Sequence, residues 1–269
     1  MISRKYILFP ILVILAVSCQ KNSVDEPFSL SYGDSIFYIK SQEYSIYPAQ
    51  SSAGTYAAFP EDGIRLDKTT GEIRVKGNDD NIFTGLKYRI THTAPNGDTS
   101  STVILISGIT YFDKFYHLSQ GDSIASPVYN GNSANTIPLN GSSFDDNNLA
   151  NSSGCSVKTT NGQINLAQTV RNGLFGTTPQ NDTRHDIRIE YKLNDASGKA
   201  QNKLDVRLYY YNTMADVATD LLETLNDRQS QGVFLGMNNS TLVDLPVFRS
   251  LNREAIAKPR PPCVIIIGQ

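Results

Sequence analysis

Short stretches in which apolar and polar residues alternate recur along the chain. Leu86, Tyr88 and Ile90 alternate with polar positions, and the segments 186–193 and 203–211 repeat the pattern. Alternation places one set of side chains on the buried face of a strand. Both later segments carry charged residues at the intervening positions, so they are expected to form an antiparallel pair with one side facing water. The pattern predicts a mainly β protein.

Turn signals separate several of these strands. Asp67-Lys68-Thr69-Thr70-Gly71 lies between the short predicted strands 64–66 and 72–75, and Asn96-Gly97 follows the strand pattern of 86–93. Asp at the start of a turn and Gly at its end suit a type I turn followed by a left-handed residue. Asn-Gly is a strong hairpin signal. Two hairpins are therefore expected within the first 110 residues.

A longer motif runs through this part of the chain and consists of Pro60, Gly63-Ile64-Arg65-Leu66-Asp67, Thr70-Gly71-Glu72-Ile73, Tyr88 and Asn96-Gly97. In these residues the chain resembles the cadherin-like, immunoglobulin-like domains of bacterial surface proteins. The resemblance covers residues 31–110 and implies an Ig-like β-sandwich. Such domains usually occur in tandem, whereas one copy is found here. The resemblance implies a fold and no activity, because sandwiches of this kind serve as spacers, adhesion modules and enzyme appendages.

Residues 111–269 are expected to form a second, β-rich α+β domain of unknown function. Its one strong helical pattern covers 214–229, where apolar residues recur at helical spacing, with Thr213 as the N-cap and Asp216 three residues later. The continuous apolar run 263–267 follows a proline-rich arm and predicts a strand that is buried on both faces.

The first 18 residues have the pattern of a secretory signal. Arg4 and Lys5 precede an apolar run of eleven residues, Ile7–Val17, which is shorter than the roughly 20 residues needed to span a bilayer. The run closes on Ala16-Val17-Ser18-Cys19, which resembles a bacterial lipobox. The resemblance implies cleavage before Cys19 and lipidation of Cys19, with residues 19–30 as a polar tether. The alternative is an ordinary secretory signal that happens to end at a cysteine.

Charge argues against nucleic acid as a partner. The chain has 24 basic and 26 acidic residues, and loss of Arg4 and Lys5 with the signal leaves 22 basic residues, a net charge of −4. No basic block remains to form the electrostatic footprint of a nucleic-acid-binding protein. No second apolar run in the sequence approaches the length of a membrane span. Contact with the membrane is therefore expected through the lipid on Cys19, at the outer membrane, on its periplasmic face or at the cell surface.

Two cysteines remain after lipidation, Cys155 and Cys263. The compartment outside the inner membrane is oxidising, so a disulfide between them is one alternative. Two separate buried thiols are the other, because free cysteine packs as a small hydrophobic residue. Sequence alone leaves both open.

The chain carries no motif that identifies an enzyme, a cofactor or a metal site. His92, His117 and His185 lie in or beside strand patterns without metal-ligand spacing, and no nucleophile elbow or phosphate loop is present. The acidic loops 78–81 and 145–148 lack the spacing of a calcium-binding loop and are interpreted as solvated.

Tyr209 and Tyr211 are the candidate ligand-binding residues. Alternation puts Tyr210 on the apolar face of its strand and sends Tyr209 and Tyr211 to the charged face, where they could form an exposed platform for a glycan. The alternative is cross-strand packing beneath a covering segment.

Together these patterns predict a non-enzymatic, lipid-anchored protein of the Gram-negative envelope with a binding, adhesion or structural role. Its partner would be a glycan or an envelope protein. The alternative hypothesis is an accessory hydrolase of polysaccharides that uses carboxylates, because the spatial separation that defines a catalytic carboxylate pair cannot be read from sequence.

Overall fold

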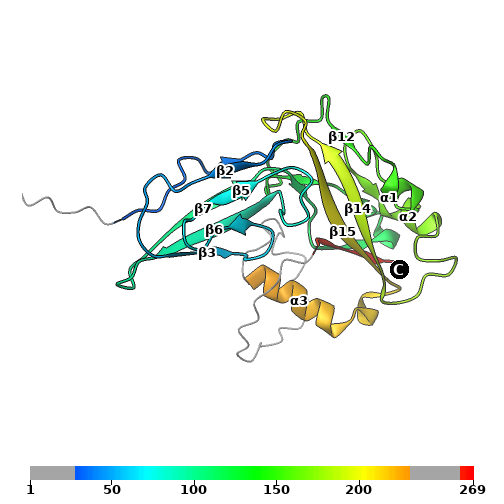
Figure 1. Cartoon of the computed structure of the whole chain (residues 1–269). Coiled ribbons are helices and arrows are strands. Elements are labelled where there is room, and N and C mark those ends of the chain that lie inside the picture. The colour runs from blue at the N-terminus through cyan, green and yellow to red at the C-terminus, as the bar shows by residue number, and fades with distance from the viewer. Residues whose placement is uncertain (1–27, 231–260) are drawn as a thin grey trace, which may run out of the picture.

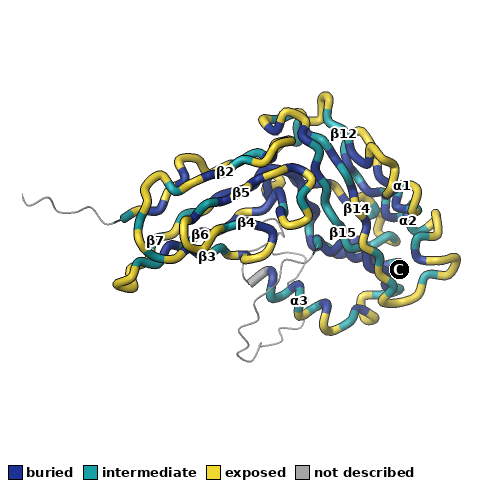
Figure 2. Tube along the Cα trace, in the orientation of Figure 1, coloured by how far each residue is buried: buried dark blue, intermediate teal, exposed yellow. Residues whose placement is uncertain are grey.

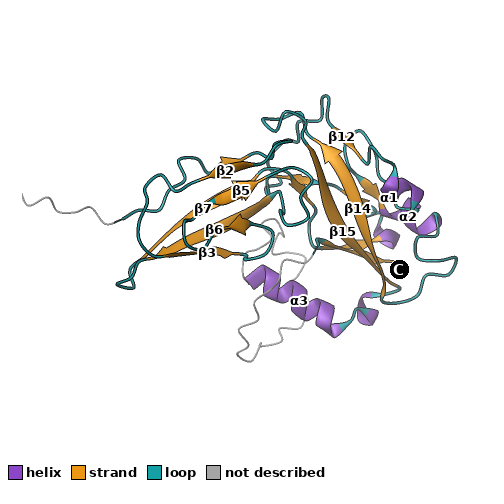
Figure 3. Cartoon of the chain, in the orientation of Figure 1, coloured by secondary structure: helices purple, strands orange, loops and turns teal. Residues whose placement is uncertain are grey.

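The structure is a computed structural model, which describes residues 28–230 and 261–269. Strands and their connections dominate the described part, and helices are few and short (Figures 1 and 3). The predicted fold class, a mainly β chain with a sandwich followed by a β-rich α+β part, is confirmed. No helix among the described residues is long and apolar enough to cross a membrane.

The first part of the chain folds as two sheets packed face to face (Figure 1). Strand order is β1-β7-β6-β3 in one sheet and β2-β5-β4 in the other. The strands are β1 (Ile36–Phe37), β2 (Tyr44–Ile46), β3 (Thr55–Phe59), β4 (Arg65–Leu66), β5 (Ile73–Val75), β6 (Leu86–Thr93) and β7 (Thr99–Ile106). Their inner faces share one core that includes Tyr56, Ile73, Tyr88 and Ile104. We call this part the sandwich.

Both predicted hairpins are present in the sandwich. The carboxylate Oδ1 of Asp67 accepts hydrogen bonds of 2.8 Å from the backbone N–H groups of Thr69 and Thr70. Gly71 then takes a left-handed conformation with φ of +72°, which a residue with a side chain rarely adopts. The turn at Asn96-Gly97 joins β6 and β7, which pair in register from Leu86↔Ile106 to Thr93↔Thr99.

The second part of the chain is built on a five-stranded mixed sheet with the order β12-β14-β15-β16-β9. Its strands are β9 (Lys114–His117), β12 (Ser143–Phe144), β14 (Thr183–Lys192), β15 (Gln201–Tyr211) and β16 (Cys263–Ile267). The predicted strands at 186–193 and 203–211 form the antiparallel pair β14–β15. The apolar run 263–267 is β16, which is fully buried and parallel to both of its neighbours.

Helices cover both faces of this sheet (Figure 1). On one face pack α1 (Leu149–Ser152) and α2 (Leu166–Arg171), together with the short pair β10 (Ile124–Ala125) and β13 (Ile164–Asn165). On the other face packs α3 (Thr219–Ser230). The remaining described elements are β8 (Ile109–Thr110), β11 (Val128–Tyr129) and the 3₁₀ turns η1 (Leu118–Gln120) and η2 (Met214–Asp216).

The main helix begins later than the sequence pattern predicts. Thr213 does cap a helical turn, because Thr213 and Asp216 form a reciprocal capping box, but this turn is η2. Val217 is extended, with φ of −65° and ψ of 127°, and α3 begins two residues later at Thr219. The break turns the chain so that Val217, Leu221 and Leu225 all pack on the sheet, and this packing outweighs helical continuity.

The sandwich and the second sheet meet through a buried polar network, which we call the joint. The side chains of Thr84, Tyr191 and Asn202 form a triangle of hydrogen bonds of 2.7–2.8 Å. Nearby, the Ser107 hydroxyl and the Gly108 N–H both donate to the side-chain oxygen of Asn130, at 2.9 and 3.0 Å. The triangle links the sandwich to β14 and β15, and the bonds to Asn130 link the end of β7 to the segment that follows β11. The predicted domain boundary at residue 110 stays a prediction.

Candidate functional site

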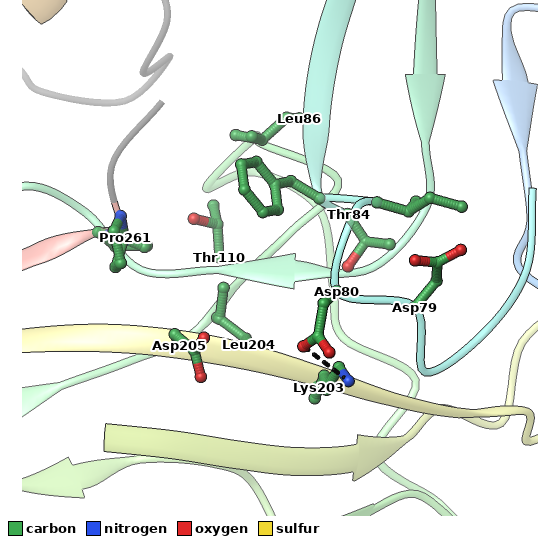
Figure 4. Close-up of a pocket in the computed structure, with 12 residues that line it drawn as sticks. Asp79, Asp80, Thr84, Leu86, Thr110, Lys203, Leu204, Asp205 and Pro261 are labelled. Carbon is green, nitrogen blue, oxygen red and sulfur yellow. Dashed lines mark ion pairs between the residues drawn. The ribbon is translucent and has the colours of Figure 1, made fainter. Parts of the chain in front are cut away.

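A cleft lies beside the joint, where the sandwich faces β15 and the start of β16 (Figure 4). Its volume is about 110 Å³. The loop before β6, the strand β15 and the pair Pro261-Pro262 contribute its walls, which combine apolar side chains with a charged rim. The apolar wall residues are Ile82, Phe83, Leu86, Leu204, Pro261 and Pro262. This is the candidate functional site.

The rim is held by ion pairs between the sandwich and the second sheet. Asp80 lies 2.8 Å from the ammonium group of Lys203 and 3.2 Å from the guanidinium group of Arg188 (Figure 4). Arg188 in turn binds Asp205 through two hydrogen bonds of 2.8 and 2.9 Å. The hydrogen bond from Lys203 is the main reason that the pKa of Asp80 lies below its usual value. The carboxylates of Asp80 and Asp205 are therefore both neutralised by ion pairs with basic side chains.

Asp79 is also committed to local contacts. One carboxylate oxygen accepts hydrogen bonds from the backbone and side chain of Asn81, and the other pairs with Arg65 at 3.0 Å. Partial burial raises the pKa of Asp79, but the hydrogen bonds from Asn81 and the charge of Arg65 outweigh it, so the net pKa is lowered.

These carboxylates do not suit acid catalysis. A general acid that cleaves a glycosidic bond needs a raised pKa so that it stays protonated, whereas the pKa values of Asp79 and Asp80 are lowered. Burial does raise the pKa of Asp113, but this side chain is 1% exposed and is bound to Arg228, so no substrate reaches it. The geometry does not favour the hydrolase alternative.

The cleft is also small. Sites for drug-sized ligands have volumes of roughly 300–1,000 Å³. A cleft of about 110 Å³ accommodates one small apolar group against Phe83 and Leu204. In chemical terms the cleft is a shallow apolar crevice with a neutralised rim, located where the two parts of the chain are fastened together.

The structure corrects the prediction that Tyr209 and Tyr211 form an exposed platform. Their side chains are 4% and 0% exposed, and the two rings stack with centroids 6.4 Å apart. They belong to the core between this face of the sheet and α3, which covers them. Alternation placed both tyrosines on the correct face, but it does not reveal that a helix covers the second half of that face.

Cys155 and Cys263 are both free and buried. They belong to different core clusters, which lie on opposite faces of the five-stranded sheet. Burial raises the pKa of each thiol to about 12. The structure therefore shows the alternative of two separate buried thiols, and neither thiol is suited to nucleophilic chemistry.

The three histidines occupy structural positions. His92 is 1% exposed, lies between the rings of Phe28 and Tyr56, and its Nε2 is 3.1 Å from the carbonyl oxygen of Ala53. His185 contacts the edge of Phe175, and His117 ends β9. Within residues 28–230 and 261–269, no group of three or more His, Cys, Asp or Glu side chains could hold a metal ion.

The two acidic loops that the sequence singled out have structural partners. Asp79 and Asp80 of the first loop bind Arg65 and Lys203. In the second loop, Asp145 accepts hydrogen bonds from the first turn of α1, and Asp146 pairs with Lys192 at 3.0 Å. Sequence did not indicate the partners of Asp80 and Asp146, because Lys203 and Lys192 lie on strands that are distant along the chain. Cys19, the predicted lipidation site, lies outside the described residues.

No family model matches the chain, and no curated protein matches its sequence. Three solved structures illustrate the similarity that a comparison of structures found. The human desmocollin-1 ectodomain is 12% identical with a TM-score of 0.22, over 68% of this chain and 36% of that one. The D00-D0 domain of intimin is 11% identical with a TM-score of 0.23, over 66% and 98%. Drosophila N-cadherin EC1-4 is 12% identical with a TM-score of 0.20, over 68% and 49%. The matched part thus spans about a third of the desmocollin-1 chain and about half of the N-cadherin chain.

Proposed function

We propose that this chain is a lipid-anchored, non-enzymatic protein of the Gram-negative envelope, in which the sandwich is a stalk that carries the second part away from the lipid surface. The anchor is Cys19, and the stalk corresponds to residues 31–110. The role is adhesive or structural, and the cleft beside the joint serves to fasten the two parts rather than to convert a substrate.

The observation that carries this proposal is that the entry of the chain and the joint lie at opposite ends of the sandwich (Figure 1). Phe28 contacts His92, near the end of β6, and the Leu30 N–H donates to Ser100 at the start of β7. Thr84 and Ser107, which belong to the joint, flank the other ends of these two strands. Eight residues of β strand separate the two ends by about 25 Å.

The length of the tether fits this arrangement. Eight residues, 20–27, lie between Cys19 and Phe28, and they reach at most about 30 Å when fully extended. An anchor on Cys19 therefore keeps the hairpin end of the sandwich close to the lipid. Because the joint is polar, buried and hydrogen-bonded, the second part follows the sandwich as a rigid extension.

The test combines lipid labelling with accessibility. Cells that express the full chain are fed labelled palmitate, and a Cys19→Ala variant is compared with a Cys155→Ala variant as the matched control. We expect label and membrane association in the original protein and in C155A, and loss of both in C19A. Label that survives in C19A would overturn the lipid anchor.

Protease treatment of intact cells, with a periplasmic protein as a lysis control, then assigns the side of the membrane. Cleavage without lysis supports display at the cell surface and an adhesive role. Protection supports the periplasmic face and a structural role. Recovery of the protein from the soluble fraction of lysed cells, rather than from the membrane fraction, would contradict the proposal in either form.

A further inference from the structure

The outer face of the four-stranded sheet β1-β7-β6-β3 carries features that the stalk role does not require. Three apolar side chains are exposed on it, Ile36 at 42%, Phe59 at 37% and Val103 at 48%. Strand register places Val103 beside Arg89 and Arg89 beside Phe59, so they form one row across three strands. The next row contains Ile36, Leu105 and Lys87. We call this surface the outer sheet face.

Lys87 and Arg89 are the two cations of this face. They lie two residues apart on β6, which puts their Cα atoms about 7 Å apart on the same side of the sheet. Both are exposed, and neither has an ion pair within residues 28–230 and 261–269. None of the residues that β3, β6, β7 and β1 direct to this face is acidic.

The remainder of the face toward the hairpin consists mainly of hydroxyl side chains. Thr91 on β6 and Ser101 on β7 are opposite each other, with their hydroxyl oxygens 2.9 Å apart. Thr93 and Thr99 form the next pair, and Thr55 of β3 lies beside Thr93. The face thus combines two unpaired cations and exposed apolar side chains at one end with an array of hydroxyl groups at the other.

We propose that the outer sheet face binds an acidic polysaccharide, a polymer whose sugar rings carry carboxylates. Arg89 and Lys87 would bind carboxylates on successive sugars, since charge-assisted hydrogen bonds are the strong ones in such contacts. Phe59 and Val103 would cover the apolar faces of the rings, and the hydroxyl array would exchange hydrogen bonds with sugar hydroxyls. Charge complementarity selects an anionic partner, and the flat, hydroxyl-rich extension favours a glycan over an acidic peptide.

The outer sheet face belongs to the sandwich. Tyr209 and Tyr211, which the sequence predicted to be exposed, belong to the second part and are buried. The binding does not depend on the lipid, so failure of the anchor and failure of this surface are separable.

The test uses the purified full-length chain in detergent, with polygalacturonate as the acidic probe and dextran as the neutral one. Affinity is measured by calorimetry at low and at high salt.

The decisive variant is the double substitution Lys87→Gln with Arg89→Gln. The matched control is Arg74→Gln with Lys76→Gln, which removes two exposed cations from β5 and the residue after it in the other sheet of the sandwich. Each pair of substitutions changes the net charge equally. Circular dichroism and thermal unfolding verify that both variants fold, and F59A tests the apolar contribution.

We expect polygalacturonate to bind, dextran to bind weakly or not at all, and salt to weaken the interaction. The K87Q/R89Q variant should lose roughly a hundredfold in affinity, because two hydrogen bonds to charged groups are lost and each is worth about one order of magnitude. The R74Q/K76Q variant should stay within about twofold of the original protein, as distant surface charges contribute little. Equal losses in both variants, or no binding by the folded original, would overturn the proposal. Binding to anionic vesicles or polyglutamate but not to polygalacturonate would overturn it as well.

Discussion

At the residue scale, the most deeply buried charges form a three-way contact between distant segments. Arg228 of α3 lies 2.9 Å from the carboxylate of Asp113, and the backbone N–H of Cys263 donates to the same carboxylate at 2.6 Å. The side chains of Asp113 and Arg228 are 1% and 3% exposed. The contact fastens α3 to the beginnings of β9 and β16.

Removal of one partner of this buried pair should be strongly destabilising. We expect Asp113→Ala to lower the free energy of unfolding by about 3 kcal/mol or more, because the guanidinium group of Arg228 would lose its buried counter-charge. Urea unfolding measures this loss. The matched control is Asp122→Ala, whose carboxylate pairs with Lys114 at the surface and should cost less than about 1 kcal/mol. Similar losses of unfolding free energy in D113A and D122A would contradict the prediction that the buried pair stabilises the fold more than the surface pair does.

The two thiols give a second test at this scale. Burial raises the pKa of Cys155 and of Cys263 to about 12, so at pH 8 about one thiol in ten thousand is ionised. Because the thiolate is the reactive form, both cysteines should resist a thiol reagent at pH 8 in the folded protein. Without any reductant, unfolding in guanidinium chloride should release two reactive thiols in a C19A chain. Release of none would mean that the two cysteines are bridged.

At the element scale, β16 determines how the second sheet is assembled. It lies between β15 and β9 and is parallel to both, and each of its five residues is buried. Its side chains alternate between the two core clusters, so Ile266 packs with Tyr116 and Leu208 on one face, and Ile265 packs with Tyr209 on the other. The last strand of the chain thus joins segments that are about 100 residues apart.

Truncation of one side chain of β16 should therefore be costly. We expect Ile266→Ala to reduce stability by about 2–5 kcal/mol, because the residue is 0% exposed and its truncation would remove packing contacts and leave a cavity in the core. The same substitution at Ile124, which is 41% exposed, should change stability by no more than about 0.5 kcal/mol. Chemical denaturation compares the two. If I266A and I124A were equally mild, β16 would not belong to the folded sheet.

The sequence predicts elements better than it predicts what covers them. Alternation and turn residues identified β6, β7, β14 and β15, because both signals act within a few residues. The continuous apolar run of β16 predicted burial on both faces, but an unpatterned run does not name its neighbours. The sequence correctly predicted which face of the strand carries Tyr209. It did not predict that α3 covers this face, because that cover depends on contacts between residues far apart in the chain.

The candidate site was even harder to predict from the sequence, because it depends on contacts between distant segments. Its walls come from the loop before β6, from β15 and from Pro261, which are far apart in the sequence and meet only in the folded chain. The acidic loop at Asp79 and Asp80 was visible as a cluster, but Lys203, which neutralises it, is more than 100 residues away. Lys87 and Arg89 of the outer sheet face were within reach of pattern analysis, because alternation already placed both on the exposed side of β6.

At the scale of the whole molecule, the joint decides whether the sandwich and the second part move as one body. The hydroxyl group of Tyr191 is hydrogen-bonded to Thr84 and Asn202. Its oxygen also accepts a hydrogen bond of 3.3 Å from the backbone N–H of Ile109. A methyl group added at Gly108 would lie 2.6 Å from this hydroxyl oxygen, so the backbone can approach the network only without a side chain. Loss of the hydroxyl would leave several buried polar groups unsatisfied.

We therefore expect Tyr191→Phe to loosen the connection between the two parts. The cost should be about 1–3 kcal/mol, because Thr84 and Asn202 would each lose a buried hydrogen-bond partner. Spin labels at Asp98→Cys on the hairpin and Lys158→Cys on the second part report the distance across the joint, and both positions are exposed. Pulsed electron paramagnetic resonance should give a narrow distance distribution in the original protein and a broader one in Y191F.

The matched control for this prediction is Tyr88→Phe. The hydroxyl group of Tyr88 is equally buried, but it donates to the carbonyl oxygens of Gly63 and Phe83, which both belong to the sandwich. Its removal should lower stability by a similar amount and leave the distance distribution narrow. A broadening of equal size in Y88F and Y191F would mean that general destabilisation, rather than the joint, governs the motion. A narrow distribution in Y191F would assign the rigidity of the stalk to contacts other than this network, and the stalk proposal would then need a different mechanical basis.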